Sequence, residues 1–183
     1  MIPYRLITKN DFQASSSNSL WGNVAHGAEI CTHILPVDGE TATGAFEAVM
    51  RPDCSFWNEV IGPLSRVGRL ALLAVGVITI GGGKQPDWYI LQHEQVHFAI
   101  NAVAARKLTA RLVTVPADSR TDRFVGRFYE IALEHASARH QSFDGETSGT
   151  YDPFLLEKWV RVLEREMETL CRPGQVCGVR IAD

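Results

Sequence analysis

The chain has 183 residues, of which 45% are hydrophobic and 21% are charged, so it is long enough to bury a core and has the composition of a globular protein. Its formal net charge is -3, and its lysines and arginines are scattered, which excludes the concentrated basic surface that binding to nucleic acid or an anionic membrane requires. We expect one domain over residues 1–183, mainly β over residues 1–60 and mainly α over residues 86–170.

The N-terminal part carries the alternating pattern of a β-hairpin. Apolar residues recur at every second position over residues 28–34 and again over residues 46–50. Asp38-Gly39 supplies a turn signal between the two runs. We therefore predict an antiparallel hairpin within residues 25–51, as part of a small sheet.

Three further features of this part are interpreted as structural. Residues 55–67 are predicted to form a helical or irregular connector. His26 and His33 fall on the hairpin without the paired spacing of metal ligands, so we interpret them as ordinary strand residues. The most apolar run, Leu70–Ile80, is too short to span a bilayer and is interpreted as a buried helix or strand, so no membrane span is expected.

The four cysteines are an even number and lack the C-x-x-C spacing of a structural zinc site. Cys171 and Cys177 enclose a Pro-Gly turn that can bring two Cα atoms within disulfide range, so we predict a disulfide there and a second between Cys31 and Cys54. Four free thiols are the alternative. Disulfides favour an oxidising compartment, so we expect an exported protein whose signal peptide is absent from this sequence.

In the C-terminal part, apolar residues recur with the spacing of α-helices over three separate stretches. The first is expected to begin at Pro86-Asp87, with Asp87 as N-cap, and to run to residue 108 or 112. The second is predicted over residues 120–142, antiparallel to the first because the break between them is short. Residues 143–149 are predicted to form a loop, and Pro153 opens a last helix that reaches Glu168.

The first of these helices contains the sequence H-E-Q-V-H at residues 93–97. Positions four apart share one face of a helix, so His93 and His97 can offer both imidazoles to one metal ion. Glu94 then lies beside the metal, where it can act as the general base on a metal-activated water. The alternative is a pair of hydrogen-bonded core histidines with a salt-bridging glutamate.

Catalytic zinc usually has a third protein ligand, and this chain has none at the metzincin spacing, because Ile100 and Val103 replace the required glycine and histidine. The region that returns to the site offers Glu130, Glu134, His135, His140 and Asp144. The two glutamates point away from the apolar stripe, and we interpret them as solvated. His135 continues the apolar stripe of the second helix, which favours it as the ligand. The length of an antiparallel second helix brings it level with His93 near residue 137, within a turn or two of both His135 and Asp144, so either residue could be the third ligand.

Residues 91–98 read L-Q-H-E-Q-V-H-F and resemble the H-E-Q-G-H-F signature of an uncharacterised family of bacterial proteins described as zinc-dependent proteases. Residues 143–147, F-D-G-E-T, are similar to the Y-D-x-E-T of that family. The chain departs from it at Val96, where the family has glycine, and at Ser148-Gly149, where a histidine normally follows. The resemblance implies an exported protein with a zincin-like α+β fold, and it selects Asp144 as the third ligand.

We therefore expect a zinc-dependent metallopeptidase that acts on a peptide or protein substrate, with Zn2+ held by His93, His97 and Asp144 and with Glu94 as general base. Tyr129, Tyr151 and His140 are candidate donors to the oxyanion. Two alternatives remain. One is a metal-binding or assembly protein without turnover, and the other is a zinc amidase or deacetylase. The sequence predicts no oligomeric state.

Overall fold

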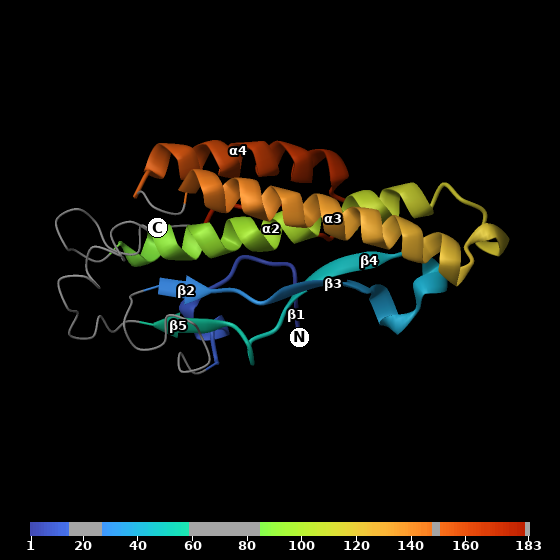
Figure 1. Cartoon of the computed structure of the whole chain (residues 1–183), viewed down its shortest axis with the longest axis horizontal. Coiled ribbons are helices and arrows are strands. Elements are labelled where there is room, and N and C mark those ends of the chain that lie inside the picture. The colour runs from blue at the N-terminus through green and yellow to red at the C-terminus, as the bar shows by residue number, and fades with distance from the viewer. Residues whose placement is uncertain (15–26, 59–84, 148–150, 182–183) are drawn as a thin grey trace.

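The computed structural model describes residues 1–14, 27–58, 85–147 and 151–181. In this part of the chain a small set of antiparallel strands precedes three long helices, so the predicted α+β class is confirmed. The helices are α2 (Asp87–Leu112), α3 (Asp122–Thr147) and α4 (Pro153–Leu170). Figure 1 shows them side by side on one side of the strands, with α3 antiparallel to α2 as expected.

The predicted hairpin is present as β3 (Thr32–Pro36) and β4 (Phe46–Met50), which pair antiparallel with Ile34 opposite Ala48. The chain between them forms two short 3-10 turns, Val37–Gly39 and Thr41–Thr43, and Gly39 there adopts a positive φ of 74°. A short first strand, β1 (Ile2–Pro3), pairs with the other edge of β4 and gives the strand order β1-β4-β3.

The connector predicted over residues 55–67 is wrong at its start, where the chain forms strand β5 (Phe56–Asn58). This strand pairs antiparallel with β2 (Gly27–Glu29) in a separate two-stranded sheet. Three residues are too few to show an alternating pattern, and the partner strand lies far back in the sequence, so the pairing had no local signal. Residues 59–67, His26 and the Leu70–Ile80 run lie outside the described residues.

Helix α2 is the centre of the core and contacts α3, α4 and strands β2, β3 and β4. Its buried residues therefore occupy several faces of the helix instead of one stripe. Phe98, which is fully buried, packs with an edge contact against Tyr4, and Leu112 joins Ile34 and Phe46 in a second cluster. Truncating a buried phenylalanine costs about 3–5 kcal/mol, so Phe98 fixes the position of α2 against the N-terminal segment.

Two helix boundaries differ from the predictions. Pro86, and not Asp87, is the N-cap of α2, because its extended backbone accepts hydrogen bonds from the N–H groups of Tyr89 and Ile90. Helix α3 continues to Thr147, so the loop predicted from residue 143 is wrong as far as the structure describes it. The helix continues because Phe143 is fully buried, which offsets the roughly 1 kcal/mol cost of Gly145 within a helix.

The predictions on the start of α4 and on the disulfides are confirmed. Helix α4 begins at Pro153, and the side chain of Asp152 caps it by accepting hydrogen bonds from the N–H groups of Phe154 and Leu155. Disulfides join Cys31 to Cys54 and Cys171 to Cys177, so no cysteine is free. Among the described helices, none has both the length and the apolar character that crossing a bilayer requires.

Candidate metal centre

His93 and His97 lie one turn apart on α2 and present the same ring atom to a common point. Their Nε2 atoms are 3.2 Å apart. Asp144, from the last turn of α3, places Oδ1 at 3.1 Å from Nε2 of His97 and at 3.7 Å from Nε2 of His93. These two imidazoles and one carboxylate form a group that could hold a metal ion.

Phe143 explains how α3 delivers Asp144 to this point. Its ring lies between the two helices, with its centroid 4.5 Å from that of His93 and 4.9 Å from that of His97. Thr147 donates a hydrogen bond from Oγ1 to the carbonyl of Phe143, within the same last turn. Asp144 is therefore positioned by a packed helix, and not by the loop that the sequence predicted.

The other candidate ligands lie elsewhere. His135, the residue that helix phase favoured, is exposed on α3 and does not belong to the group. Glu130 and Glu134 are also exposed, as expected. His33 lies on β3 with Nε2 at 3.7 Å from the sulfur of Cys31, and it too is outside the group.

Glu94 is buried next to the group, with 6% of its surface exposed. Its Oε2 accepts a hydrogen bond of 2.9 Å from the N–H of Ile30, in the segment between β2 and β3. Burial raises the pKa of Glu94 to about 7, although the charge of His97 and the bond from Ile30 act in the opposite direction. The carboxyl can therefore exchange a proton near neutral pH.

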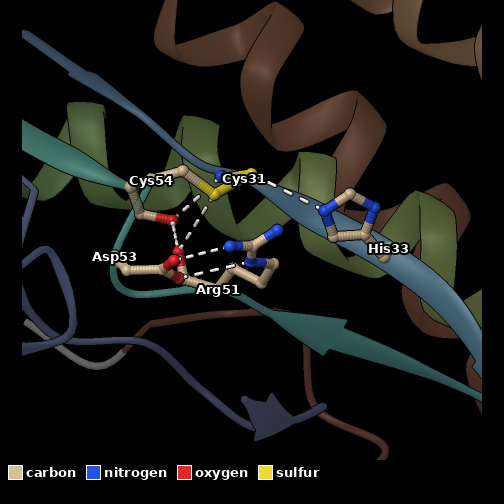
Figure 2. A network of polar contacts seen from close by, with 6 residues as sticks. Cys31, His33, Arg51, Asp53 and Cys54 are labelled. Atoms are coloured by element: carbon tan, nitrogen blue, oxygen red, sulfur yellow. Dashed lines mark hydrogen bonds and ion pairs between the residues drawn. A yellow bond between two sulfur atoms is a disulfide. The ribbon is translucent and has the colours of Figure 1, made fainter. Parts of the chain in front are cut away.

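The segment that holds Glu94 is itself fixed to the turn before β5. Figure 2 shows Cys31 bonded to Cys54 beside Arg51 and Asp53. The N–H of Cys31 donates to Oγ of Ser55 at 2.9 Å, and the N–H of Arg51 donates to the carbonyl of Cys31 at 2.8 Å. One covalent bond and two hydrogen bonds thus restrain the residue that follows Ile30.

Charge in the group is arranged for a cation. Burial lowers the pKa of His93 to about 4, so its imidazole is neutral at pH 7 and has a free lone pair. Burial also acts to raise the pKa of Asp144, but its contacts with the rings of His93 and His97 outweigh this and hold the pKa well below the usual range. Burial lowers the pKa of His97, whereas Asp144 and Glu94 raise it, and the net direction is upward.

The group faces a cavity of about 1120 Å³ that is lined by the strand segment 28–32 and by α2 and α3. His93, Glu94, His97 and Asp144 all line it. Tyr129 does not, because its hydroxyl donates to the carbonyl of Ile34 at 2.8 Å. Tyr151 also lies outside the lining and packs on Tyr89, with ring centroids 4.8 Å apart. Of the three candidate oxyanion donors, the cavity therefore contains only His140.

A polar chain behind His97 was not expected from the sequence. Nδ1 of His97 lies 2.8 Å from Nδ1 of His140, and Nε2 of His140 lies 3.1 Å from Oδ1 of Asn101. Asn101 in turn donates from Nδ2 to Oγ1 of Thr32 at 2.7 Å. The available signal was the four-residue spacing of His93, His97 and Asn101, which puts all three on one face of α2.

No protein-family model, no curated protein and no solved structure matches the chain.

Proposed function

We propose that this protein is a zincin-like, zinc-dependent metallopeptidase that hydrolyses a peptide bond in a substrate bound in the cavity. The observation that carries the proposal is the convergence of three ligand atoms and one buried carboxyl group on a single cavity. His93, His97 and Asp144 supply the ligand atoms, and Glu94 supplies the carboxyl group. The resemblance of residues 91–98 and 143–147 to a family described as zinc-dependent proteases supports the same function.

The residues fit zinc in both spacing and kind. Ligand atoms about 2.0–2.1 Å from a tetrahedral zinc ion lie roughly 3.3–3.4 Å from one another. The three separations in the group are 3.1, 3.2 and 3.7 Å. Two imidazoles with one carboxylate are also a common ligand set of catalytic zinc, which leaves a fourth position for water or substrate. A small adjustment of His93 would equalise the three separations.

The chemistry that zinc supplies at such a site is polarisation of the scissile carbonyl and acidification of water. Glu94 takes the proton of the attacking water as general base and delivers it to the leaving amine. The hydrogen bond from Ile30 holds Oε2 of Glu94, so the carboxyl has a fixed orientation. A pKa of about 7 in the metal-free protein suits a group that takes up and then releases a proton at neutral pH.

One observation favours a second candidate, a protein that binds the metal without turnover. Neither Tyr129 nor Tyr151 lines the cavity, and both ring nitrogens of His140 have hydrogen-bond partners. The three side chains expected as oxyanion donors are thus either outside the cavity lining or already hydrogen-bonded through both ring nitrogens. A zinc amidase would use the same zinc and the same base, so a non-peptide amide is the other substrate class.

The two disulfides support a further part of the proposal, that the protein is exported to an oxidising compartment. The substrate is then an extracytoplasmic peptide or protein. Peptide hydrolysis in such a compartment needs no nucleotide or redox cofactor beyond the metal.

The experiment is elemental analysis of the purified protein, followed by a screen of mixed peptides with mass-spectrometric detection. We expect about one zinc per chain, lost in the double variant His93→Ala, His97→Ala and kept in His135→Ala, which removes an exposed histidine of α3. Glu94→Gln should keep zinc and lose cleavage by at least about a hundredfold. Bound zinc without cleavage of any peptide would favour the second candidate, and absence of bound metal would rule out both.

A further inference from the structure

We propose that His140, held by Asn101 and Thr32, is a positioning residue that fixes the tautomer and ring orientation of His97, so that Nε2 of His97 offers its lone pair to the metal. This inference rests on the proposed metal site and adds to it three residues that do not touch the metal. They come from three elements, since Thr32 begins β3, Asn101 lies on α2 and His140 lies on α3.

The contacts form one unbranched chain that ends at the metal group. It runs from Thr32 through Asn101 and His140 to Nδ1 of His97, with separations of 2.7, 3.1 and 2.8 Å. The rings of His97 and His140 are stacked, with centroids 5.0 Å apart and an interplanar angle of 24°. Both nitrogens of His140 are used within this chain, so neither is left to bind the metal.

The direction of the hydrogen bonds follows from which groups can donate. The amide nitrogen of Asn101 donates to Thr32, so the amide oxygen faces His140 and can only accept. Nε2 of His140 must then carry the proton, and its Nδ1 is an acceptor. His97 consequently donates from Nδ1, so Nε2 is the nitrogen that can give up any proton and offer its lone pair to a metal on the side of His93 and Asp144.

The reversed chain has the opposite consequence. If Thr32 donated to the oxygen of a turned Asn101 amide, the amide nitrogen would donate to His140, and His140 would donate to His97. Nε2 of His97 would then carry a proton directed at the other two ligand atoms and could not bind a cation. The orientation of one amide, 8% exposed on α2, therefore determines whether the site can bind metal.

A residue that hydrogen-bonds to the non-coordinating nitrogen of a metal-bound histidine contributes to the affinity of the site for the metal. Loss of such a partner typically weakens metal binding by roughly ten- to a hundredfold. We expect a change of this size in zinc affinity for His140→Ala, measured by competition with a chromophoric chelator. His135→Ala, an exposed histidine on the same helix, is the matched control and should bind zinc as the unmodified protein does.

Two variants of Asn101 separate positioning from packing. Asn101→Asp replaces the amide oxygen with another acceptor, so zinc affinity should be kept within about threefold. Asn101→Leu has similar volume but no acceptor, and affinity should fall roughly tenfold or more. This pair tests the inference even if His140→Ala does not fold. Equal zinc affinity in the Asp and Leu variants would overturn it.

The tautomer itself can be read by long-range ¹H–¹⁵N correlation spectra of the imidazole rings in the zinc-free protein. We expect His97 to carry a proton on Nδ1 and His140 to be the Nε2–H form. Observation of His97 as the Nε2–H form would overturn the inference. Because this measurement needs no metal, it also distinguishes failure of the inference from failure of the proposed function, which is measured by zinc content.

Discussion

Two faces of helix α2 bury polar side chains, and they do so in different ways. On one face, Gln92 and Gln95 bind backbone groups of the chain ends. Gln92 donates to the carbonyl of Val179 at 2.8 Å and accepts from the N–H of Ile181 at 2.8 Å. Gln95 accepts from the N–H of Ile7 at 2.8 Å. These amides replace hydrogen bonds that water would otherwise make, so their role is structural.

On the other face, His93 and His97 are satisfied mainly by Asp144, by His140 and by each other. Side chains that are hydrogen-bonded mainly to one another and that line a cavity can exchange these contacts for contacts with a ligand in the cavity. The difference teaches that burial of polar groups does not by itself mark a functional site. The two faces differ in the nature of these partners, which are mainly backbone N–H and carbonyl groups on one face and ionisable side chains on the other.

The largest expected effect that tests this comparison is on metal affinity. Asp144→Ala should weaken zinc binding by more than about a hundredfold, beyond the range typical of groups that act through a ligand. It should also lower the free energy of unfolding of the metal-free protein, because the contacts that lower the pKa of Asp144 are lost, although solvent screens them at this half-exposed carboxylate. Chelator competition and urea denaturation measure the two quantities. Unchanged zinc affinity in Asp144→Ala would show that the three atoms do not bind metal together.

A second test uses the pH dependence of stability without metal. The pKa of Glu94 is raised in the folded protein to about 7, so this group contributes stability that is fully present below its unfolded pKa of about 4.5. That stability is lost as the pH rises to about 7, and the loss approaches about 3 kcal/mol. In the presence of a chelator, Glu94→Gln should therefore gain stability relative to the unmodified protein between pH 4.5 and 7.5.

The measurement is the difference in free energy of unfolding between the two proteins at each pH, which cancels the titration of groups they share. Glu168→Gln, which removes an exposed carboxylate of α4, is the control. A difference for Glu94→Gln that does not change with pH would contradict the buried, protonated carboxyl.

The two disulfides provide a third test, because the same kind of bond restrains two different parts of the chain. Cys31–Cys54 restrains the segment that holds Glu94 and closes the longer loop, with a sequence separation of 23 against 6 for Cys171–Cys177. Chain entropy predicts that replacing both cysteines by serine costs about 3 kcal/mol for the first pair and about 2 kcal/mol for the second. Thermal denaturation of both double variants tests this order, and only the first should also reduce peptide hydrolysis.

The smallest expected effect concerns the face of α2 that carries Gln92 and Gln95. Gln95→Leu keeps the volume but leaves the buried N–H of Ile7 without its acceptor, which should cost about 1–3 kcal/mol of unfolding free energy. Zinc affinity should be unchanged, since Gln95 is not in the metal group. Gln13→Leu, an exposed glutamine, is the control. Reduced zinc affinity in Gln95→Leu would show that the two faces are not independent.

Much of this site could be predicted from local spacing. Four-residue spacing predicted that His93 and His97 share a face, and the structure brings their Nε2 atoms together. Asp144 could be selected as the third ligand only through the resemblance to the family motif, because the apolar stripe predicted for the second helix favoured His135. Helix phase failed there because α3 buries the face that carries Val125, Ala136 and Phe143, which leaves His135 exposed. Which face a helix buries depends on tertiary contacts that no local pattern contains.

The fold shows the same limit. The β3–β4 hairpin has its alternation within one stretch of sequence and was predicted, whereas the β2–β5 pair was not, because its strands are short and distant in sequence. The chain from Thr32 to His97 likewise joins a strand and two helices. Its residues can be recognised as partners only after the three elements have been packed together.

The position of Asp144 within α3 has a mechanical consequence. Helices α2 and α3 are connected in the chain only at the end remote from His93, through residues 113–121, and neither disulfide joins them. A zinc ion held by residues of both helices would therefore act as a cross-link at their open end. Saturation at a hundred times the dissociation constant adds about 2.7 kcal/mol to the stability of the pair. Removing the metal would remove this cross-link, so the helix ends that line the cavity would be less stable.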